Sequence, residues 1–382
     1  MTRAEQHRIL LLQERLRGEG IDLYLTDDPD SICYFTGYWG YLGMDFGRPT
    51  FLVVPHADEP ILVTPAMEAE MARTLTGVSQ ILAWTDGVGG EWRDPLLKLL
   101  GRTRGVVGIE AGRLHPVLAR AMHPCLAHAP RDVAPILAAL RMIKTPAEIA
   151  VMRQAGQVAL AMVEAARVTI APGVPEYEVV LAVIHAGTRQ AAEFLKGETA
   201  VRCASPMIAN LQIMQSGPDT AMVHARPSVR PIAEGDAVYL CFCGIANFRH
   251  MKLGFDREFF IGRSSQAQER CYEVALKAQQ TALAMVRPGA IAEEIHLAAQ
   301  EVYRSAGFGF SYRTGRGIGY SFLEKPELKA GDTTRLAEGM TLAIDGGITI
   351  PGELGARVGD SIVVTPGGFE FLTPYPREFT IL

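Results

Sequence analysis

The stretch whose residue types could do chemistry covers residues 235–262, where the pattern predicts two β-strands joined by a loop. The second strand, expected over residues 255–261, sets Asp256 and Glu258 among Phe and Ile side chains. An acidic side chain in apolar surroundings costs free energy unless it is paired or used, so we expect a site here. A second predicted hairpin, residues 340–365, is expected to pair with the first.

Two of the six cysteines, Cys241 and Cys243, stand two residues apart in and after the first strand. That spacing directs both thiols to one face of the strand. It suits neither a zinc knuckle nor a redox motif. Reduced thiols in a core strand are the favoured interpretation, and a chemical role is the alternative.

The composition indicates a globular protein of two domains. The chain has 382 residues, of which 48% are hydrophobic and 21% charged. A net charge of −5 without a basic block argues against nucleic acid or an anionic membrane surface as the main partner. No apolar run is long enough to span a membrane, and the first 20 residues predict an amphipathic helix rather than a signal peptide. We therefore expect a cytoplasmic protein.

Predicted strands and helices alternate over residues 1–140, which indicates an α/β domain. Thr145-Pro146-Ala147-Glu148 then forms a capping box with proline at the first helical position, so a long helix begins there and the domain boundary is placed just before it. Residues 141–382 contain a loose internal repeat of two helices followed by a hairpin. The predicted helices cover residues 145–168, 176–194, 267–285 and 291–306. The pattern favours a pseudo-symmetric α+β domain with a curved central sheet.

A loop at residues 37–49, GYWGYLGMDFGRP, is rich in glycine and aromatic residues. Its local sequence fits an irregular surface loop and a ligand-facing lid about equally well. Both interpretations stay open on the local sequence.

The order of these elements and several motifs resemble the pita-bread family of creatinase, prolidase, aminopeptidase P and methionine aminopeptidase. The matching motifs are Lys144-Thr145-Pro146-x-Glu148-Ile149, His224-x-x-Pro227, Gly315-x-Gly317-Ile318-Gly319 and Gly355-x-Arg357-x-x-Asp360-Ser361. The resemblance covers the whole chain. It implies an α+β fold with an N-terminal α/β domain and a C-terminal pita-bread catalytic domain.

The metallopeptidases of this family bind two metal ions through two aspartates, a histidine and two glutamates. This chain carries, in the same order, Cys241, Gly254, Arg316, Asp345 and Gly359 at those positions. Glycine offers no ligand atom, and a guanidinium group does not lose its proton to become one. Two remaining candidates are too few for a stable divalent site, so we expect no metal and no cofactor.

The metal-free branch of the family, typified by creatinase, is more similar. Phe46-Gly47-Arg48-Pro49 matches the creatinase loop whose phenylalanine and arginine face the substrate, with the arginine holding its carboxylate. His224 matches the catalytic histidine. Asp256 and Asp345 fall on glutamates that bind the guanidinium group.

Two matches to creatinase fail, because the binding tyrosine falls on Lys252 and the second carboxylate-binding arginine has no counterpart near residues 324–327. The resemblance therefore implies a metal-independent C–N hydrolase with another substrate, a small zwitterion carrying a carboxylate and a guanidino, amidino or cyclic amidine group. It also implies a homodimer with a site shared between chains.

The resemblance assigns roles to particular residues. His224 would activate water and protonate the leaving nitrogen, since its side chain titrates near neutral pH. Asp256 and Asp345 would clamp the amidinium group. The expected substrate-binding residues are Phe46, Arg48, Lys252, Arg316 and Tyr320.

Alternatives remain open at this stage. An Arg316–Asp345 ion pair would fill the former metal pocket and leave a catalytically inactive binding protein. An Xaa-Pro peptidase-like enzyme and a lyase that abstracts a proton beside a carboxylate are further possibilities. Asp360 and Arg357 are expected to form a structural pair beneath the second hairpin.

Overall fold

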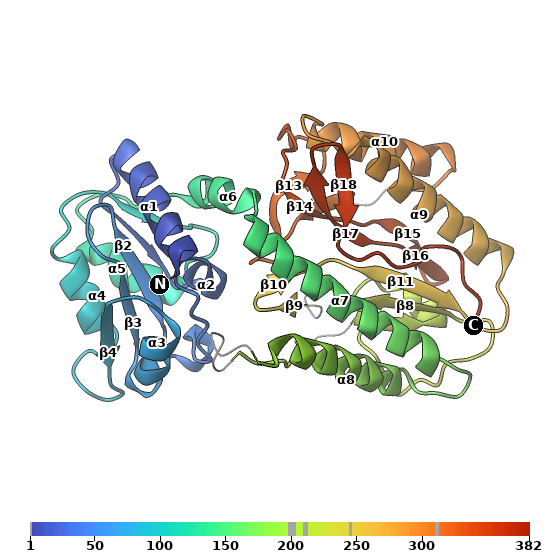
Figure 1. The fold of residues 1–382 in the computed structure, drawn as a ribbon, viewed down its shortest axis with the longest axis horizontal. Coiled ribbons are helices and arrows are strands. Elements are labelled where there is room, and N and C mark those ends of the chain that lie inside the picture. The colour runs from blue at the N-terminus through green and yellow to red at the C-terminus, as the bar shows by residue number, and fades with distance from the viewer. Residues whose placement is uncertain (1, 198–203, 209–212, 244–246, 310–312) are drawn as a thin grey trace. The chain divides into compact units, whose positions relative to one another are not determined.

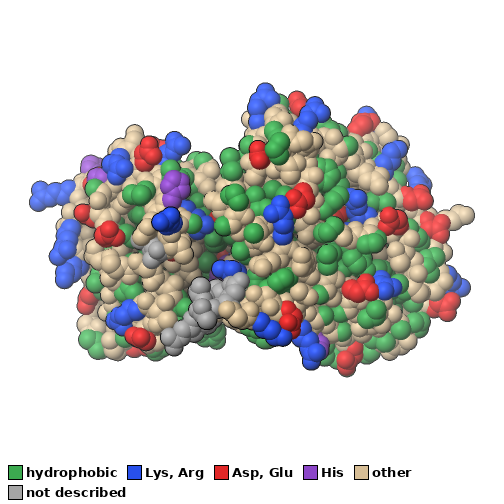
Figure 2. Space-filling model, viewed as in Figure 1, with side chains coloured by type: hydrophobic (Ala, Val, Ile, Leu, Met, Phe, Trp, Pro, Cys, Tyr) green, Lys and Arg blue, Asp and Glu red, His purple; other side chains and the backbone are tan. Residues whose placement is uncertain are grey.

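The computed structural model describes residues 2–197, 204–208, 213–243, 247–309 and 313–382. The chain divides into two compact units, Met1–Arg141 and Met142–Leu382 (Figure 1). Among the described residues, no helix has the length and apolar character needed to cross a membrane. On the face drawn in Figure 2, basic and acidic side chains are interspersed over the surface of each unit.

The N-terminal unit is built on one six-stranded mixed sheet with the strand order β4-β3-β2-β1-β5-β6. Strands β1, β2 and β3 are antiparallel neighbours, and the outer pairs β3–β4, β1–β5 and β5–β6 are parallel. The strands are β1 (Leu23–Thr26), β2 (Phe51–Pro55), β3 (Ile61–Pro65), β4 (Gln80–Trp84), β5 (Val107–Ile109) and β6 (Arg131–Asp132). The helices are α1 (Arg3–Gly18), α2 (Pro29–Thr36), α3 (Ala69–Leu75), α4 (Arg93–Leu100), α5 (Pro116–Met122) and α6 (Ala134–Met142).

The C-terminal unit contains the two predicted helix pairs: α7 (Pro146–Thr169) with α8 (Glu176–Leu195), and α9 (Gln266–Met285) with α10 (Ala292–Ser305). Helix α7 begins at the predicted capping box, in which the Thr145 side chain accepts from the Glu148 N–H and the Glu148 side chain accepts from the Thr145 N–H. The predicted α+β class, an α/β domain followed by a domain with two helix pairs over β-sheets, is confirmed.

The strands of the C-terminal unit form a three-stranded sheet β11-β8-β7, a five-stranded sheet β13-β12-β14-β17-β18 and the small pairs β15–β16 and β9–β10. In the first sheet the strands are β7 (Ile213–Ser216), β8 (Ala237–Cys241) and β11 (Asp256–Phe260). The second has β12 (Gly315–Gly317), β13 (Glu324–Leu328), β14 (Thr341–Ile344), β17 (Asp360–Thr365) and β18 (Gly368–Phe371). The pairs use β9 (Asn247–Phe248), β10 (Met251–Lys252), β15 (Gly347–Ile350) and β16 (Leu354–Arg357).

The expected pairing between the two hairpins is limited to a single isolated bridge between Asp256 and Gly359. The neighbours of Gly359 already have other partners, because Arg357 pairs with Gly347 and Asp360 pairs with Ile344. Val358 and Gly359 lie between β16 and β17, and the bridge at Gly359 brings the start of β11 to the segment before β17.

Each helix pair covers a separate apolar core. Helices α7 and α8 pack with the inner side chains of β8 and β11, and helices α9 and α10 pack with those of β14 and β17. Burial of this apolar surface fixes both sheets, so the strand ends that meet at Asp256 and Gly359 have defined positions.

The expected Asp360–Arg357 pair is wrong. Asp360 forms a buried ion pair with Arg257, whose Nη2 lies 2.7 Å from its Oδ1. Arg357 instead donates through its two Nη atoms to the Thr220 carbonyl and the Thr349 hydroxyl. Arg257 is directed toward Asp360 because β11 meets the chain at Gly359, whose carbonyl also accepts from the Arg257 guanidinium.

Candidate active site

A cavity of about 710 Å³ lies within the C-terminal unit, where the ends of β8, β11, β12, β14, β15 and β16 meet. It combines acidic, basic, thiol and imidazole side chains with a smaller number of apolar ones. The polar and charged groups that line it are His224, Arg226, Tyr239, Cys241, Cys243, Asp256, Arg313, Arg316, Asp345, Thr349 and Arg357.

Asp256 is the first residue of β11 and faces Cys241 of β8 across the antiparallel ladder. Its Oδ1 accepts a hydrogen bond from the Tyr239 hydroxyl at 3.1 Å and a longer one from the Cys243 thiol at 3.8 Å. Burial, followed by the nearby charge of Asp345, raises the pKa of Asp256 to about 6. The carboxyl can therefore take up or release a proton near neutral pH.

The buried Arg316 of β12 forms an ion pair with the partly buried Asp345 at the end of β14. The guanidinium also donates to the Phe322 carbonyl at 3.1 Å and lies over the Phe322 ring. Its Nη2 donates to Cys243 Sγ at 3.4 Å. Arg316 is thus held from three directions, with a permanent positive charge in the centre of the site.

The two glycines at predicted ligand positions leave no room for ligand side chains. A Cβ atom on Gly254 would lie 2.5 Å from the Ala343 Cβ and 3.1 Å from Arg316 Nη2. On Gly359 it would lie 2.5 Å from Asp256 Oδ2 and 3.0 Å from the Asp345 Cβ. The described residues therefore do not fit the dinuclear metal centre that the family resemblance implies.

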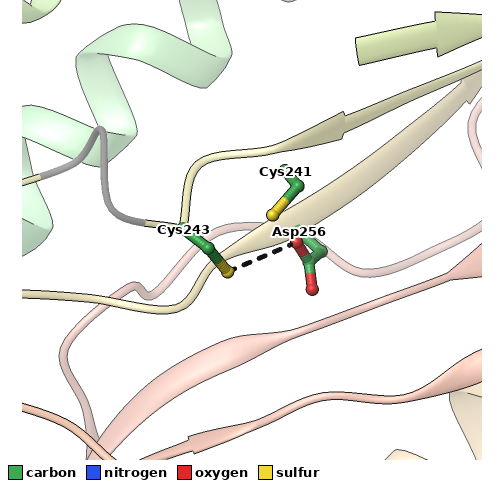
Figure 3. Close-up of side chains that lie close together, drawn as sticks. All are labelled: Cys241, Cys243 and Asp256. Atoms are coloured by element: carbon green, nitrogen blue, oxygen red, sulfur yellow. Dashed lines mark hydrogen bonds between the residues drawn. The ribbon is translucent and has the colours of Figure 1, made fainter. Parts of the chain in front are cut away.

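Cys241, Cys243 and Asp256 converge in the cavity (Figure 3), and their ligand-type atoms lie within 4.8 Å of one another. Thiolates and a carboxylate are groups that bind zinc. However, the Arg316 guanidinium donates to Cys243 Sγ, so a fixed positive charge already occupies the space beside one of the three groups. The charge of Arg316 opposes the binding of a cation here.

His224 lines the cavity from the segment before β8, and its side chain is exposed. Within the described part of the chain it makes no hydrogen bond, so its imidazole is free to contact a ligand. The structure thus brings His224, Asp256, Arg316 and Asp345 together around one cavity, as the sequence predicts.

Lys252 and Tyr320, which were predicted to bind substrate, do not line this cavity. Lys252 lies in β10, and its Nζ donates to the Tyr320 carbonyl. Phe46 and Arg48 belong to the N-terminal unit, where Arg48 Nε donates to Asp86 Oδ2 at 2.9 Å. Their roles in substrate binding and the expected homodimer stay predictions.

Sequence reasoning missed several cavity residues, chiefly Cys243, Tyr239, Arg226 and Arg313. Two signals were available in the sequence. Cys243 shares a strand face with Cys241, and Arg226 follows His224 by two residues. Neither pattern indicates which face of the strand borders a cavity, because the cavity forms only where the five-stranded sheet meets the three-stranded one.

Comparison with known proteins places the chain in a family. Residues 150–366 match the model of metallopeptidase family M24, and residues 8–143 match the creatinase/prolidase N-terminal domain. The chain belongs to family M24. These matches confirm the pita-bread family that the sequence motifs indicated.

The relatives of this M24 protein include proteins named as a cyclase and as dipeptidases. It is 34% identical over 391 aligned positions to the agropine synthesis cyclase of Rhizobium rhizogenes, covering 97% of this chain and 96% of the relative. It is 27% identical to the Xaa-Pro dipeptidase of Pyrococcus furiosus, with 98% and 99% covered. The solved Xaa-Pro dipeptidase of Bacillus anthracis superimposes with a TM-score of 0.82 at 25% identity, covering 99% of this chain and all of that one.

Proposed function

We propose that this M24 protein is a metal-independent enzyme that forms or breaks an ester- or amide-type bond in a small carboxylate-bearing molecule, in a ring-closing or ring-opening reaction. The observation that carries the proposal is the Arg316–Asp345 ion pair at two of the former metal-ligand positions. Loss of the metal leaves acid–base catalysis by side chains as the available chemistry, and the cavity supplies His224 and Asp256 for it.

The charge balance of the cavity supports a substrate with a carboxylate. Four arginines line the cavity against two carboxylates: Arg226, Arg313, Arg316 and Arg357 against Asp256 and Asp345. An excess of guanidinium groups attracts anions and can grip a carboxylate through two parallel hydrogen bonds. Arg226 is exposed and has no ion pair or hydrogen bond among the described residues, so it suits this role.

The Arg316–Asp345 ion pair weakens the amidinohydrolase hypothesis drawn from the sequence. In that hypothesis Asp256 and Asp345 both hold the amidinium group of the substrate. Asp345 is already paired with a guanidinium group of the protein itself, that of Arg316. A cationic substrate would have to displace Arg316 or bind beside its positive charge, and both cost free energy.

The ring-closing or ring-opening reaction is inferred from the cyclase name of the relative that shares 34% identity across nearly the whole chain. A cyclase and a hydrolase can begin with the same attack on a carbonyl-type carbon. In a hydrolase water takes up the acyl group at the end of the reaction, whereas in a cyclase another group of the same substrate molecule does so. In either case His224 would carry the proton to or from the leaving group.

The experiment is a thermal-shift and product screen of the purified protein with agropine, Gly-Pro, creatine, pyroglutamate and pyroglutamamide. Pyroglutamate and its amide form the matched pair, since they differ in the carboxylate. We expect acids to raise the melting temperature by mass action, the amide to do so far less, and Arg226→Gln to reduce the difference.

Two outcomes would overturn the proposal. Selective binding and cleavage of creatine would support the amidinohydrolase hypothesis instead. Stabilisation by a ligand without any product, under conditions where Gly-Pro and agropine are also unchanged, would support a binding protein of the same fold.

A further inference from the structure

We propose that Cys243 is the covalent nucleophile of this site and that it passes the substrate acyl group through a thioester. The inference rests on the proposed function, because it names the group that attacks the carbonyl-type carbon. It also gives a chemical role to a thiol that the sequence pattern favours as structural.

Its place in the cavity and two neighbours, Asp256 and Arg316, make Cys243 suited to this role. It lies just past the end of β8 and lines the cavity, and its side chain is half-buried. The thiol donates to Asp256 Oδ1, 3.8 Å from Sγ, and Figure 3 shows the sulfur directed at that carboxylate. Arg316 Nη2 donates to the same sulfur at 3.4 Å. The guanidinium thus places a fixed positive charge directly beside the sulfur that attacks.

Cys241 offers a contrast from two residues away. Its thiol is buried, and the residue pairs with Asp256 at the end of the β8–β11 ladder. A hydrogen bond with Cys243 and burial raise the pKa of Cys241 well above its ordinary value. The Cys241 thiol therefore stays protonated, and it helps to hold Cys243 and Asp256 in place.

The proposed steps balance without a redox partner. The Cys243 proton passes to Asp256, and the thiolate attacks the carbonyl-type carbon of the substrate. The bond from that carbon to the leaving oxygen or nitrogen breaks, and the leaving group takes a proton from His224. Water, or a hydroxyl or amine of the substrate itself, then attacks the thioester and gives its proton to His224, while Sγ recovers the proton held by Asp256.

A thioester would allow the same site to catalyse either hydrolysis or ring closure. Attack by water gives hydrolysis, and attack by a group within the same molecule closes a ring. The choice depends on which nucleophile the cavity places beside the thioester, and the first half of the reaction is unchanged.

The test does not require the natural substrate. The full-length protein is treated with a limiting amount of iodoacetamide, a neutral alkylating reagent, and the modified cysteines are quantified by peptide mapping. Cys125 is the internal reference, because it is also a half-buried free thiol but lies in the N-terminal unit. We expect Cys243 to react roughly tenfold faster or more than Cys125, and the ratio to fall in Arg316→Gln.

An equal or slower rate at Cys243 would overturn the inference. So would one zinc ion per chain that blocks its alkylation, since a metal-bound thiolate is not the nucleophile. If Arg316→Gln does not fold, the wild-type ratio still decides.

Activity on any compound turned over in the screen gives the second readout. Cys243→Ala should lower turnover by roughly a hundredfold or more, whereas Cys125→Ala should leave it unchanged. Full activity in Cys243→Ala together with loss in His224→Ala would overturn the nucleophile and leave the proposed function standing. Failure of the proposed function would instead appear as no turnover by the wild type.

Discussion

His224→Ala is expected to lower turnover by about two to four orders of magnitude, the usual contribution of acid–base catalysis. The imidazole lines the cavity, is exposed and has no hydrogen-bond partner within the described residues. Its removal therefore breaks no contact that the fold needs, and the melting temperature should change little. Steady-state kinetics on a substrate from the screen, with a melting curve for each variant, measures both quantities.

His128→Ala is the matched control, because His128 is exposed in the N-terminal unit. It should retain wild-type turnover and stability. Turnover of His224→Ala within a few-fold of the wild type would mean that another group moves the proton. A large fall in melting temperature would instead assign His224 a structural role.

The second large effect concerns Glu258, a buried residue of β11. Burial raises the pKa of Glu258 to about 8, although the backbone N–H of Arg357 and its charge act in the opposite direction. The folded pKa thus lies above the unfolded value near 4.5, so the folded state holds a proton that the unfolded chain releases. This contribution to stability is complete below pH 4.5 and is lost as the pH rises to about 8. A shift of that size corresponds, as an upper bound, to roughly 5 kcal/mol.

The glutamine side chain in Glu258→Gln cannot ionise, so this variant should lose the pH dependence of the free energy of unfolding that Glu258 causes. The variant and the wild type should unfold at similar urea concentrations near pH 5, and the variant should be the more stable one above pH 8. Glu370→Gln, at a partly exposed ion pair on β18, is the control and should follow the wild-type curve at both pH values. Parallel curves for wild type and Glu258→Gln would contradict the raised pKa.

The local parts of the fold could be predicted from the sequence because local chemistry decides them. The capping box at Thr145 and Glu148 sets the start of α7 whatever packs against it, and the helix forms where it was expected. The pairing of the two hairpins could not be predicted, since it depends on which residues near Gly359 are already paired within other strands.

In the candidate site, too, the residues of sequence motifs could be predicted, whereas contacts between distant parts of the chain could not. Family motifs identified His224, Asp256, Arg316 and Asp345, and all four line one cavity. The partner of Asp360 was assigned wrongly because Arg357 is close in sequence, whereas Arg257 is close in space. The proposed role of Cys243 likewise depends on Arg316, which comes from a different sheet and is 73 residues away in the chain.

The proposed function requires that the Arg316–Asp345 ion pair stands in place of the family metal centre in a working enzyme. The most direct test is elemental analysis of the purified protein before and after treatment with a strong chelator, with turnover measured on the same samples. We expect no stoichiometric transition metal and equal turnover in both samples. One or two metal ions per chain, removed by the chelator together with activity and restored with it, would contradict the proposed function.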